Sequence, residues 1–177
     1  MTPKIDSIES DRLHLEIRRE SHAAELFKPL CEKEIYRYMI RDVPESIRWL
    51  AEGFRQLETL VSSDGKEIYL GWIGRDKTSK APVGIFEITI SSDEAFIAYT
   101  ILKEHWGQGY AAEATQAVIK YVGENYHIKR FVLEMDTRNR GSVRVAEKLD
   151  FDFVKVTDNA CFLKNFVSHE FQFQKML

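Results

Sequence analysis

A glycine-containing loop between a β-type run and an amphipathic helix constrains this sequence more than any other feature. The segment 106–112 reads Trp-Gly-Gln-Gly-Tyr-Ala-Ala; a β-type run, 95–102, precedes it and a helical pattern, 111–125, follows it. Gly107 and Gly109 lack Cβ atoms, so the backbone there can approach a ligand closely and adopt positive φ. Unpaired N–H groups and the positive end of the helix dipole favour an anion such as a pyrophosphate. The loop therefore predicts an anion-binding turn, although a plain tight turn would explain the same two glycines.

Two common nucleotide-binding loops do not fit this segment. A Gly-x-Gly-x-x-Gly fingerprint would need a third glycine where Ala112 stands. A phosphate loop of the Walker A type would need Gly-Lys followed by Ser or Thr, and the sequence has none there. Both nucleotide hypotheses are set aside.

The remaining periodicity predicts one α/β domain over residues 1–177. Strand patterns cover about residues 12–18, 67–74, 82–90, 95–102, 129–136, 151–156 and 168–176. Helical patterns cover 23–31 behind Ser21 as N-cap, a stretch that opens near Pro44 and runs to Val61, 111–125 and 142–149. Strands followed by a strand, helix, strand, helix, strand tail predict a mixed sheet of about seven strands with helices on both faces.

Composition and charge exclude several classes of protein. With 44% hydrophobic and 30% charged residues and no apolar run near the roughly 20 residues of a membrane span, we expect no membrane partner. A net charge of -3 without a Lys/Arg block argues against nucleic acid. The N-terminus has no secretory pattern, and the isolated Cys31 and Cys161 indicate the cytoplasm, where we expect both as buried apolar residues. The scattered histidines lack metal-ligand spacing, so we expect no metal.

A second polar stretch runs from Glu134 to Ser142, off a predicted strand and into a short predicted helix. Asn139 could cap that helix with its side chain. Its amide could also hydrogen-bond a ligand that lies beside the strand end, and the two roles do not exclude each other.

These motifs together resemble the acetyl-CoA motifs of the Gcn5-related N-acetyltransferases (GNAT family), in the branch that includes RimJ and RimL. The resemblance rests on three segments: Trp106 to Ala114, Asn139-x-x-Ser142 and Glu147-Lys148-Leu149-Asp150-Phe151. It spans residues 10–155, and the opening Ser10-Asp11-Arg12-Leu13 is similar to that branch as well. The resemblance implies a mostly antiparallel sheet with a splayed central strand pair, and acetyl-CoA as co-substrate.

The resemblance also implies where acetyl-CoA would bind. Backbone amides from Gln108 to Ala112 would hold the pyrophosphate, and the pantetheine arm would pair with the edge Tyr99 to Leu102 like an added strand. The residues expected to bind the coenzyme are Tyr99, Thr100, Ile101, Leu102, Trp106, Gly107, Gln108, Gly109, Tyr110, Ala111, Ala112, Asn139 and Ser142.

Acetyl transfer to an amine needs a base, because an amine is a cation at neutral pH. Glu134 aligns with the glutamate that serves as base in related N-terminal alanine acetyltransferases; we expect it in a partly buried site that raises its pKa, with an ordinary exposed strand glutamate as the alternative. Glu87 is the reserve candidate.

Ser142 resembles the serine that this branch places near the coenzyme sulfur, although it could merely begin the helix. Many relatives carry an acidic tyrosine where this chain has Ala146.

Two departures from the family pattern leave alternatives open. Asp150 replaces a glycine of the family motif, at a position where a left-handed helix end is expected. This replacement and the missing tyrosine leave open the alternative that the protein binds acyl-CoA as a sensor without catalysing transfer. The resemblance to this branch implies a protein N-terminal α-amine, such as that of a ribosomal protein, as acceptor, but the branch also includes enzymes that act on small amines and antibiotics. The resemblance implies a monomer or homodimer that transfers the acetyl group directly.

Overall fold

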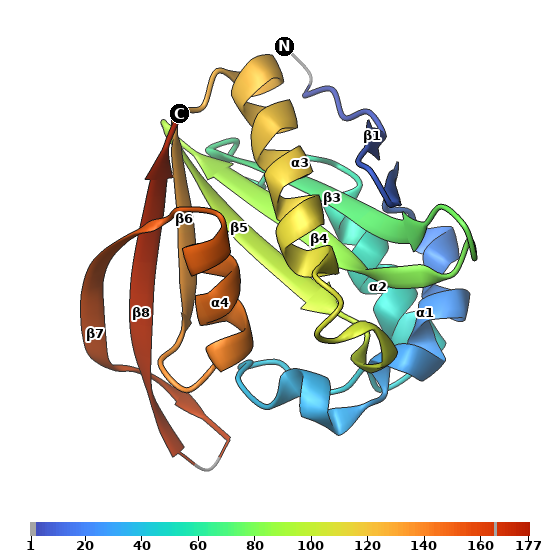
Figure 1. Ribbon diagram of the computed structural model, residues 1–177. Coiled ribbons are helices and arrows are strands. Elements are labelled where there is room, and N and C mark those ends of the chain that lie inside the picture. Colours follow the sequence, from blue (N-terminus) through green and yellow to red (C-terminus); the bar gives the residue numbers. More distant parts are fainter. Residues whose placement is uncertain (1–2, 165) are drawn as a thin grey trace.

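The computed structural model describes residues 3–164 and 166–177. Its core is one mixed sheet of eight strands in the order β1-β2-β3-β4-β5-β6-β8-β7 (Figure 1). The strands are β1 (Ile8–Glu9), β2 (Leu13–Ile17), β3 (Glu67–Asp76), β4 (Pro82–Ser91), β5 (Glu94–Ile101), β6 (Arg130–Asp136), β7 (Asp152–Leu163) and β8 (Phe166–Met176). Neighbouring strands are antiparallel except for β5 and β6, which are parallel.

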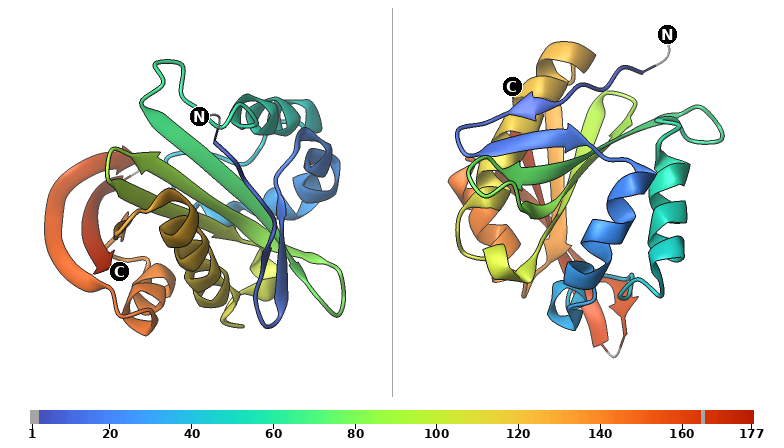
Figure 2. Two further views of the ribbon diagram at one scale, coloured as in Figure 1. Left: turned by 90° about the horizontal axis from the view of Figure 1, so that it is seen from above. Right: turned by 90° about the vertical axis from the view of Figure 1, so that its right-hand side faces the viewer.

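Four α-helices cover the two faces of the sheet (Figures 1 and 2). They are α1 (Ala23–Leu30), α2 (Ile47–Leu57), α3 (Tyr110–Tyr126) and α4 (Arg140–Lys148). Helices α3 and α4 pack on one face over the larger core, which includes fully buried Phe131 and Ile119. Helices α1 and α2 pack on the other face over a smaller core around Ile73 and Ile85. The predicted mixed sheet with helices on both faces is confirmed.

Several predicted boundaries at the N-terminal side are wrong. The eighth strand is the two-residue β1, too short to leave a pattern in the sequence. Helix α2 begins three residues after Pro44, because Ser46 is extended and its hydroxyl accepts the Trp49 N–H at 3.1 Å, which makes Ser46 the N-cap. Ser21 is not a cap, since a 3-10 turn, Glu20–His22, precedes α1.

The C-terminal strands form a longer hairpin than the sequence predicts. β7 continues to Leu163 instead of ending near Val156, and its pairing with β8 shifts between Thr157 and Cys161. Asn159 has a φ of 51° in this irregular segment, so the strict alternation that reveals a strand is interrupted there. The expectation for the cysteines fails in part, because Cys31 is exposed at the end of α1.

The central strands β5 and β6 separate soon after they begin to pair. Their register holds only for Glu94 with Arg130, Ala95 with Phe131 and Phe96 with Val132. Beyond these three pairs, β5 keeps its antiparallel pairing with β4 and β6 keeps its pairing with β8. The rest of β5 thus faces a gap between the strands, as the splayed pair implied by the family resemblance requires.

Candidate active site

The edge of β5 that faces this gap offers backbone groups to a ligand. The Leu102 N–H points the other way and bonds to the Val83 carbonyl on β4 at 3.0 Å. Because backbone groups alternate in direction along a strand, those of Tyr99 and Ile101 face the gap, whereas those of Thr100 and Leu102 face β4. The Ile101 carbonyl accepts the indole N–H of Trp106 at 2.8 Å. Of the four predicted edge residues, Tyr99 is therefore the one with the fullest set of backbone groups toward the gap.

The glycine loop lies just beyond the end of β5. Gly107 and Gly109 have φ values of 75° and 83°, in the left-handed region that favours glycine, and Gly109 is the N-cap of α3. A Cβ at Gly107 would meet nothing within 4 Å, so this part of the loop is open to a ligand. The first N–H groups of α3, from Tyr110 to Ala112, have no partner within the helix. The loop is built as an anion site at the positive end of a 17-residue helix.

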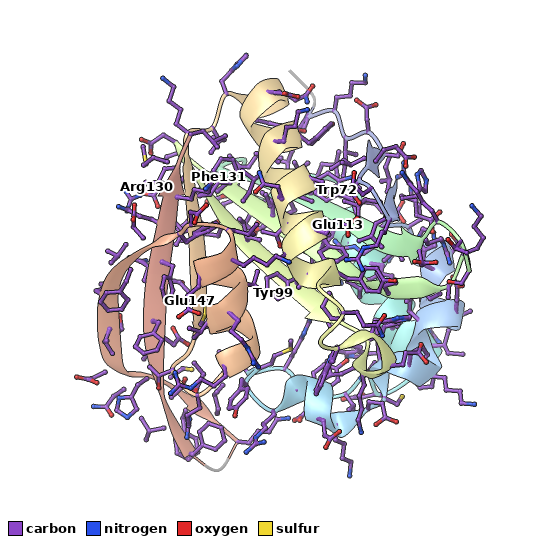
Figure 3. All side chains as sticks on the ribbon, viewed as in Figure 1. Trp72, Tyr99, Glu113, Arg130, Phe131 and Glu147 are labelled. Atoms are coloured by element: carbon purple, nitrogen blue, oxygen red, sulfur yellow. The ribbon has the colours of Figure 1, made fainter. Side chains whose placement is uncertain are left out.

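Side chains from the N-terminal strands hold the loop in place. Arg12 donates its Nε to Glu113 at 2.6 Å and its Nη1 to the Gln108 carbonyl at 3.1 Å, and its guanidinium lies 4.5 Å from the centre of the Tyr110 ring. Ser10 also donates to Glu113 at 2.7 Å. Burial opposes ionisation of Glu113, but these hydrogen bonds more than offset it and the pKa of its carboxyl lies below the ordinary value. Figure 3 shows Glu113 on the β1–β2 side of α3.

Two cations approach the loop at Gly109, and sequence reasoning assigned a role to neither. A Cβ on Gly109 would lie 3.5 Å from Nη2 of Arg12 and 3.8 Å from Nζ of Lys148. Lys148 comes from the last turn of α4 and makes no ion pair within the described residues. Open backbone amides flanked by two cations fit a diphosphate group. The sequence signal for both residues was their place in motifs that carry the family resemblance, Arg12 in the opening motif and Lys148 in the motif that ends at Phe151.

Helix α4 brings the second predicted motif to the gap. Asn139 is its N-cap, and the side-chain oxygen accepts the Ser142 N–H at 3.2 Å, so the capping role is confirmed. At the other end, Asp150 has a φ of 54° and the Phe151 N–H bonds to the Ala146 carbonyl, which is the expected left-handed helix end. Ser142 is half-buried in the first turn, on the side of the gap covered by α4.

On the opposite face of the sheet, the two candidate bases lie in one row of side chains. Glu87 on β4 pairs with Ala98 on β5, and the β5–β6 register extended by two residues from Phe96 and Val132 would set Ala98 beside Glu134. Ala98 is exposed and has a small side chain. It therefore leaves space on the sheet surface between the carboxylates of Glu87 and Glu134.

The two carboxylates of this row have different surroundings. Glu134 is exposed and accepts a hydrogen bond from Gln172 at 2.8 Å, so the expectation of a partly buried site is wrong. Glu87 forms an ion pair with Arg18, whose side chain is 5% exposed and lies under the Phe54 ring. Glu87 is thus tied into the fold, whereas Glu134 is free to meet an acceptor.

The wide end of the gap is bounded by the β7–β8 hairpin. Asp136, the last residue of β6, accepts hydrogen bonds from Arg138 at 2.6 Å and from Ser168 at 2.7 Å. The paired Arg138 lowers the pKa of the Asp136 carboxyl to about 2, against the effect of burial. Lys164 near the hairpin tip contacts Asp42 at 2.7 Å. A hollow of about 530 Å³ lies there between the hairpin and residues 33–43.

Two expectations from the sequence are that the protein has no metal site and no membrane-spanning helix. No group of three His, Cys, Asp or Glu side chains suited to a metal ion occurs in the described part of the chain. None of the helices formed by residues 3–164 and 166–177 combines the length and apolar character of a bilayer crossing.

A mixed sheet that opens between two parallel strands, beside a glycine loop at a helix start, defines a class of α/β proteins with an anion site at the loop and an open strand edge next to it. Within that class, the chain belongs to the GNAT acetyltransferase family: the family described as "Acetyltransferase (GNAT) domain" matches residues 12–152. The chain is accordingly an acetyl-CoA-dependent N-acetyltransferase.

Three known proteins show what this chain resembles in sequence and in fold. YkkB of Bacillus subtilis, an uncharacterized protein, is 27% identical over 153 residues, covering 82% of this chain and 85% of YkkB. The uncharacterized N-acetyltransferase YoaA of the same organism is 26% identical over 147 residues, 81% of each chain. A solved acetyltransferase of Salmonella typhimurium, described as modifying the N-terminal serine of ribosomal protein L7/L12, superposes with a TM-score of 0.84 at 18% identity, covering 97% of this chain and 99% of that one. This last likeness shows the fold alone.

Proposed function

We propose that this chain transfers the acetyl group of acetyl-CoA directly to a primary amine that approaches from the α1/α2 face of the sheet. The observation that carries the proposal is the gap between β5 and β6, which opens beside the glycine loop on one face and beside Glu134 on the other. Acetyl-CoA supplies the activated acetyl thioester. The amides from Gln108 to Ala112, with Arg12 and Lys148, would bind its diphosphate, and the Tyr99 backbone would align its extended arm.

Glu134 is the base in this proposal. It projects from β6 on the face opposite α4, next to the place that the register gives to Ala98, and it is exposed enough to take a proton from an incoming ammonium group. Glu87 is unsuited to that task, because its proton uptake would leave the buried Arg18 without a counter-charge. Neither cysteine lies beside a motif, which favours direct transfer over an acetyl-enzyme intermediate.

The acceptor that we propose is the α-amine of a protein N-terminus. In support, the hollow between the hairpin tip and residues 33–43 has a volume of about 530 Å³, which is room for the residues that follow an N-terminal amine. The Salmonella enzyme of the same fold is described as acting on a ribosomal-protein N-terminus. A small-amine acceptor is the second candidate, because Lys164 and Asp42, which both line this hollow, form an ion pair with each other and limit the room in it.

An acceptor panel tests the proposal. Purified protein, acetyl-CoA and either peptides with free N-termini, the same peptides with blocked N-termini, polyamines or aminoglycosides are mixed, and release of the coenzyme thiol is followed. We expect release with free N-termini and none with blocked ones. Release with small amines alone would favour the second candidate.

A binding measurement separates an inactive enzyme from a wrong assignment. Saturating coenzyme at about 100 times its Kd stabilises a folded protein by about 2.7 kcal/mol. A rise in Tm without thiol release from any acceptor would indicate a non-catalytic acyl-CoA sensor. If the Tm does not respond to the coenzyme, the site assignment itself is wrong. Gly109→Val, which forces a branched side chain into a φ of 83°, should abolish the rise.

A further inference from the structure

Tyr99 carries a buried hydroxyl for which the fold provides no partner. Its oxygen has essentially no solvent exposure and makes no hydrogen bond within residues 3–164 and 166–177. The side chain packs against the larger core on the α3/α4 face of β5, and Figure 3 places it between α3 and α4. Buried polar groups are rarely left unpaired, because desolvation without a hydrogen bond costs free energy. An unpaired buried hydroxyl beside a binding gap therefore points to a partner that arrives with the ligand.

The surroundings of this hydroxyl suit a donor. Burial raises the pKa of Tyr99 to about 12, an effect that the nearby Ser142 opposes, so the phenol keeps its proton at neutral pH. The Ser142 side chain is near enough to lower the Tyr99 pKa, but its geometry does not satisfy the Tyr99 hydroxyl with a hydrogen bond. A neutral tyrosine hydroxyl can donate one hydrogen bond and can also accept. At this site its O–H group has no acceptor, so it remains available to donate to a ligand.

The position of the ring relative to the gap indicates what the hydroxyl meets. The backbone of Tyr99 faces the gap between β5 and β6, and its side chain rises toward the first turn of α4, where Ser142 stands. Ala146, one turn further along α4, is fully buried in the same core and carries no polar group. Ser142 is the side chain of α4 that lies near the Tyr99 hydroxyl.

We propose that Tyr99 is a catalytic residue whose hydroxyl donates a hydrogen bond to the coenzyme sulfur as the thiolate leaves, together with Ser142. The inference rests on the proposed acetyl transfer. In that step the amine nitrogen bonds to the acetyl carbon, and the carbon–sulfur bond breaks with its electron pair on sulfur. Glu134 takes the first proton from the ammonium group before attack and passes it to solvent. The nitrogen loses its second proton to Glu134 as the amide forms, and the sulfur takes one proton from solvent as the free thiol is released. Tyr99 keeps its own proton and stabilises the negative sulfur in between.

The first test compares Tyr99→Phe with the wild type. Loss of a hydrogen bond to a charged atom should lower kcat by roughly 10- to 100-fold and leave the KM for acetyl-CoA nearly unchanged. The variant should be as stable as the wild type or more so, because it removes an unpaired buried hydroxyl. Tyr69→Phe is the matched control: its hydroxyl bonds to Glu67 on β3, away from the gap, and its loss should not change kcat.

The second test measures how Tyr99 affects the sulfur of the bound coenzyme. Binding of coenzyme A and of desulfo-coenzyme A, which lacks the sulfur, is measured across a pH series, and the thiol pKa of bound coenzyme A is followed by thiolate absorbance. Tyr99→Phe should raise that thiol pKa and weaken coenzyme A binding at high pH, while desulfo-coenzyme A binds both proteins equally. An unchanged thiol pKa, or equal weakening of both ligands, would show that Tyr99 only packs. If wild-type protein binds neither ligand, the proposed function fails with it.

Discussion

Glu134 and Glu87 show how the same side chain takes different roles within one row of the sheet. Glu87 neutralises the buried guanidinium of Arg18, and Glu134 faces solvent beside the gap. Their spacing in the sequence does not reveal this difference, since both are single acidic residues in apolar strands. The contrast comes from Arg18, which lies 69 residues away from Glu87 along the chain.

Substitution of the two glutamates should therefore have opposite signatures. We expect Glu134→Gln to lower kcat by about 10²- to 10⁴-fold without a change in Tm, and to remove the rise of kcat/KM with pH that reports a base. Glu87→Gln should destabilise the fold by about 3 kcal/mol, because it leaves the Arg18 charge buried and unpaired. Glu124→Gln, at an exposed position of α3, serves as control. Full activity of Glu134→Gln would exclude it as the base.

Removal of the positive charge of Lys148 tests whether the glycine loop binds the coenzyme diphosphate. Its Nζ lies 3.8 Å from the place of a Cβ on Gly109, and Lys148→Ala should weaken coenzyme binding roughly tenfold at low salt. The loss should shrink as salt rises, because an exposed charge is screened. Titration calorimetry at two ionic strengths measures both effects. Lys120→Ala, on the exposed side of α3, is the control; equal weakening in both variants would mean a general effect of charge.

At the scale of elements, the hairpin β7–β8 depends on the carboxylate at the end of β6. The Asp136 side chain is 1% exposed and bonds to Arg138 and Ser168, so it joins β6 to β8 where the sheet is no longer held by β5. An ion that is both buried and fully hydrogen-bonded stabilises the folded state only while it is ionised.

This pairing predicts how stability depends on pH. The pKa of Asp136 is lowered to about 2 in the folded protein from an ordinary value near 3.8, so its contribution is complete above about pH 4 and disappears as pH falls toward 2. Asp136→Asn should lower the free energy of unfolding by about 2 kcal/mol at pH 6 and reduce the acid sensitivity in this window. Urea unfolding from pH 2 to 6 measures this, with the exposed turn residue Asp93→Asn as control. A variant that keeps the wild-type acid sensitivity would contradict the assignment.

The sequence predicted most elements because their patterns are local. The glycine loop, α3, α4 with its Asn139 cap and the left-handed Asp150 follow from residue types within a few positions. The second half of β7 was missed because its alternation is broken at Asn159. Lys148 was missed, and Tyr99 was predicted to bind the coenzyme through its backbone without a role for its hydroxyl. Both side-chain roles depend on contacts between elements that are distant in sequence, and a lysine or tyrosine in an amphipathic segment gives no local signal of such contacts.

At the scale of the whole molecule, the proposed reaction divides its two tasks between the faces of the sheet. The loop, the cations at Gly109 and the hydroxyls of Tyr99 and Ser142 lie on the α3/α4 side. The exposed Ala98 and Glu134 lie on the α1/α2 side. Coenzyme and acceptor can therefore bind together from opposite sides and meet at the gap.

A substitution at Ala98 tests this separation. Ala98→Leu adds bulk between Glu87 and Glu134 on the acceptor side, and it should lower kcat/KM for the amine roughly tenfold or more through misplacement of the nitrogen. The Kd for coenzyme A and the Tm should stay close to wild type, because the position is exposed. Steady-state kinetics with each substrate varied, together with calorimetry, gives both values. A matching loss of coenzyme affinity would show that the two faces are not independent.

The short parallel pairing between β5 and β6 also has a consequence for how proteins with this fold can diverge in evolution. In the part of the chain that the structure describes, strand pairing joins the hairpin half of the sheet to the half that carries the glycine loop only through Glu94, Ala95 and Phe96 of β5. Insertions or deletions in the hairpin half would change the room offered to an acceptor and leave the phosphate-holding half undisturbed. A short attachment of this kind lets descendants of one ancestor exchange one amine for another while all of them continue to draw on the same acyl donor.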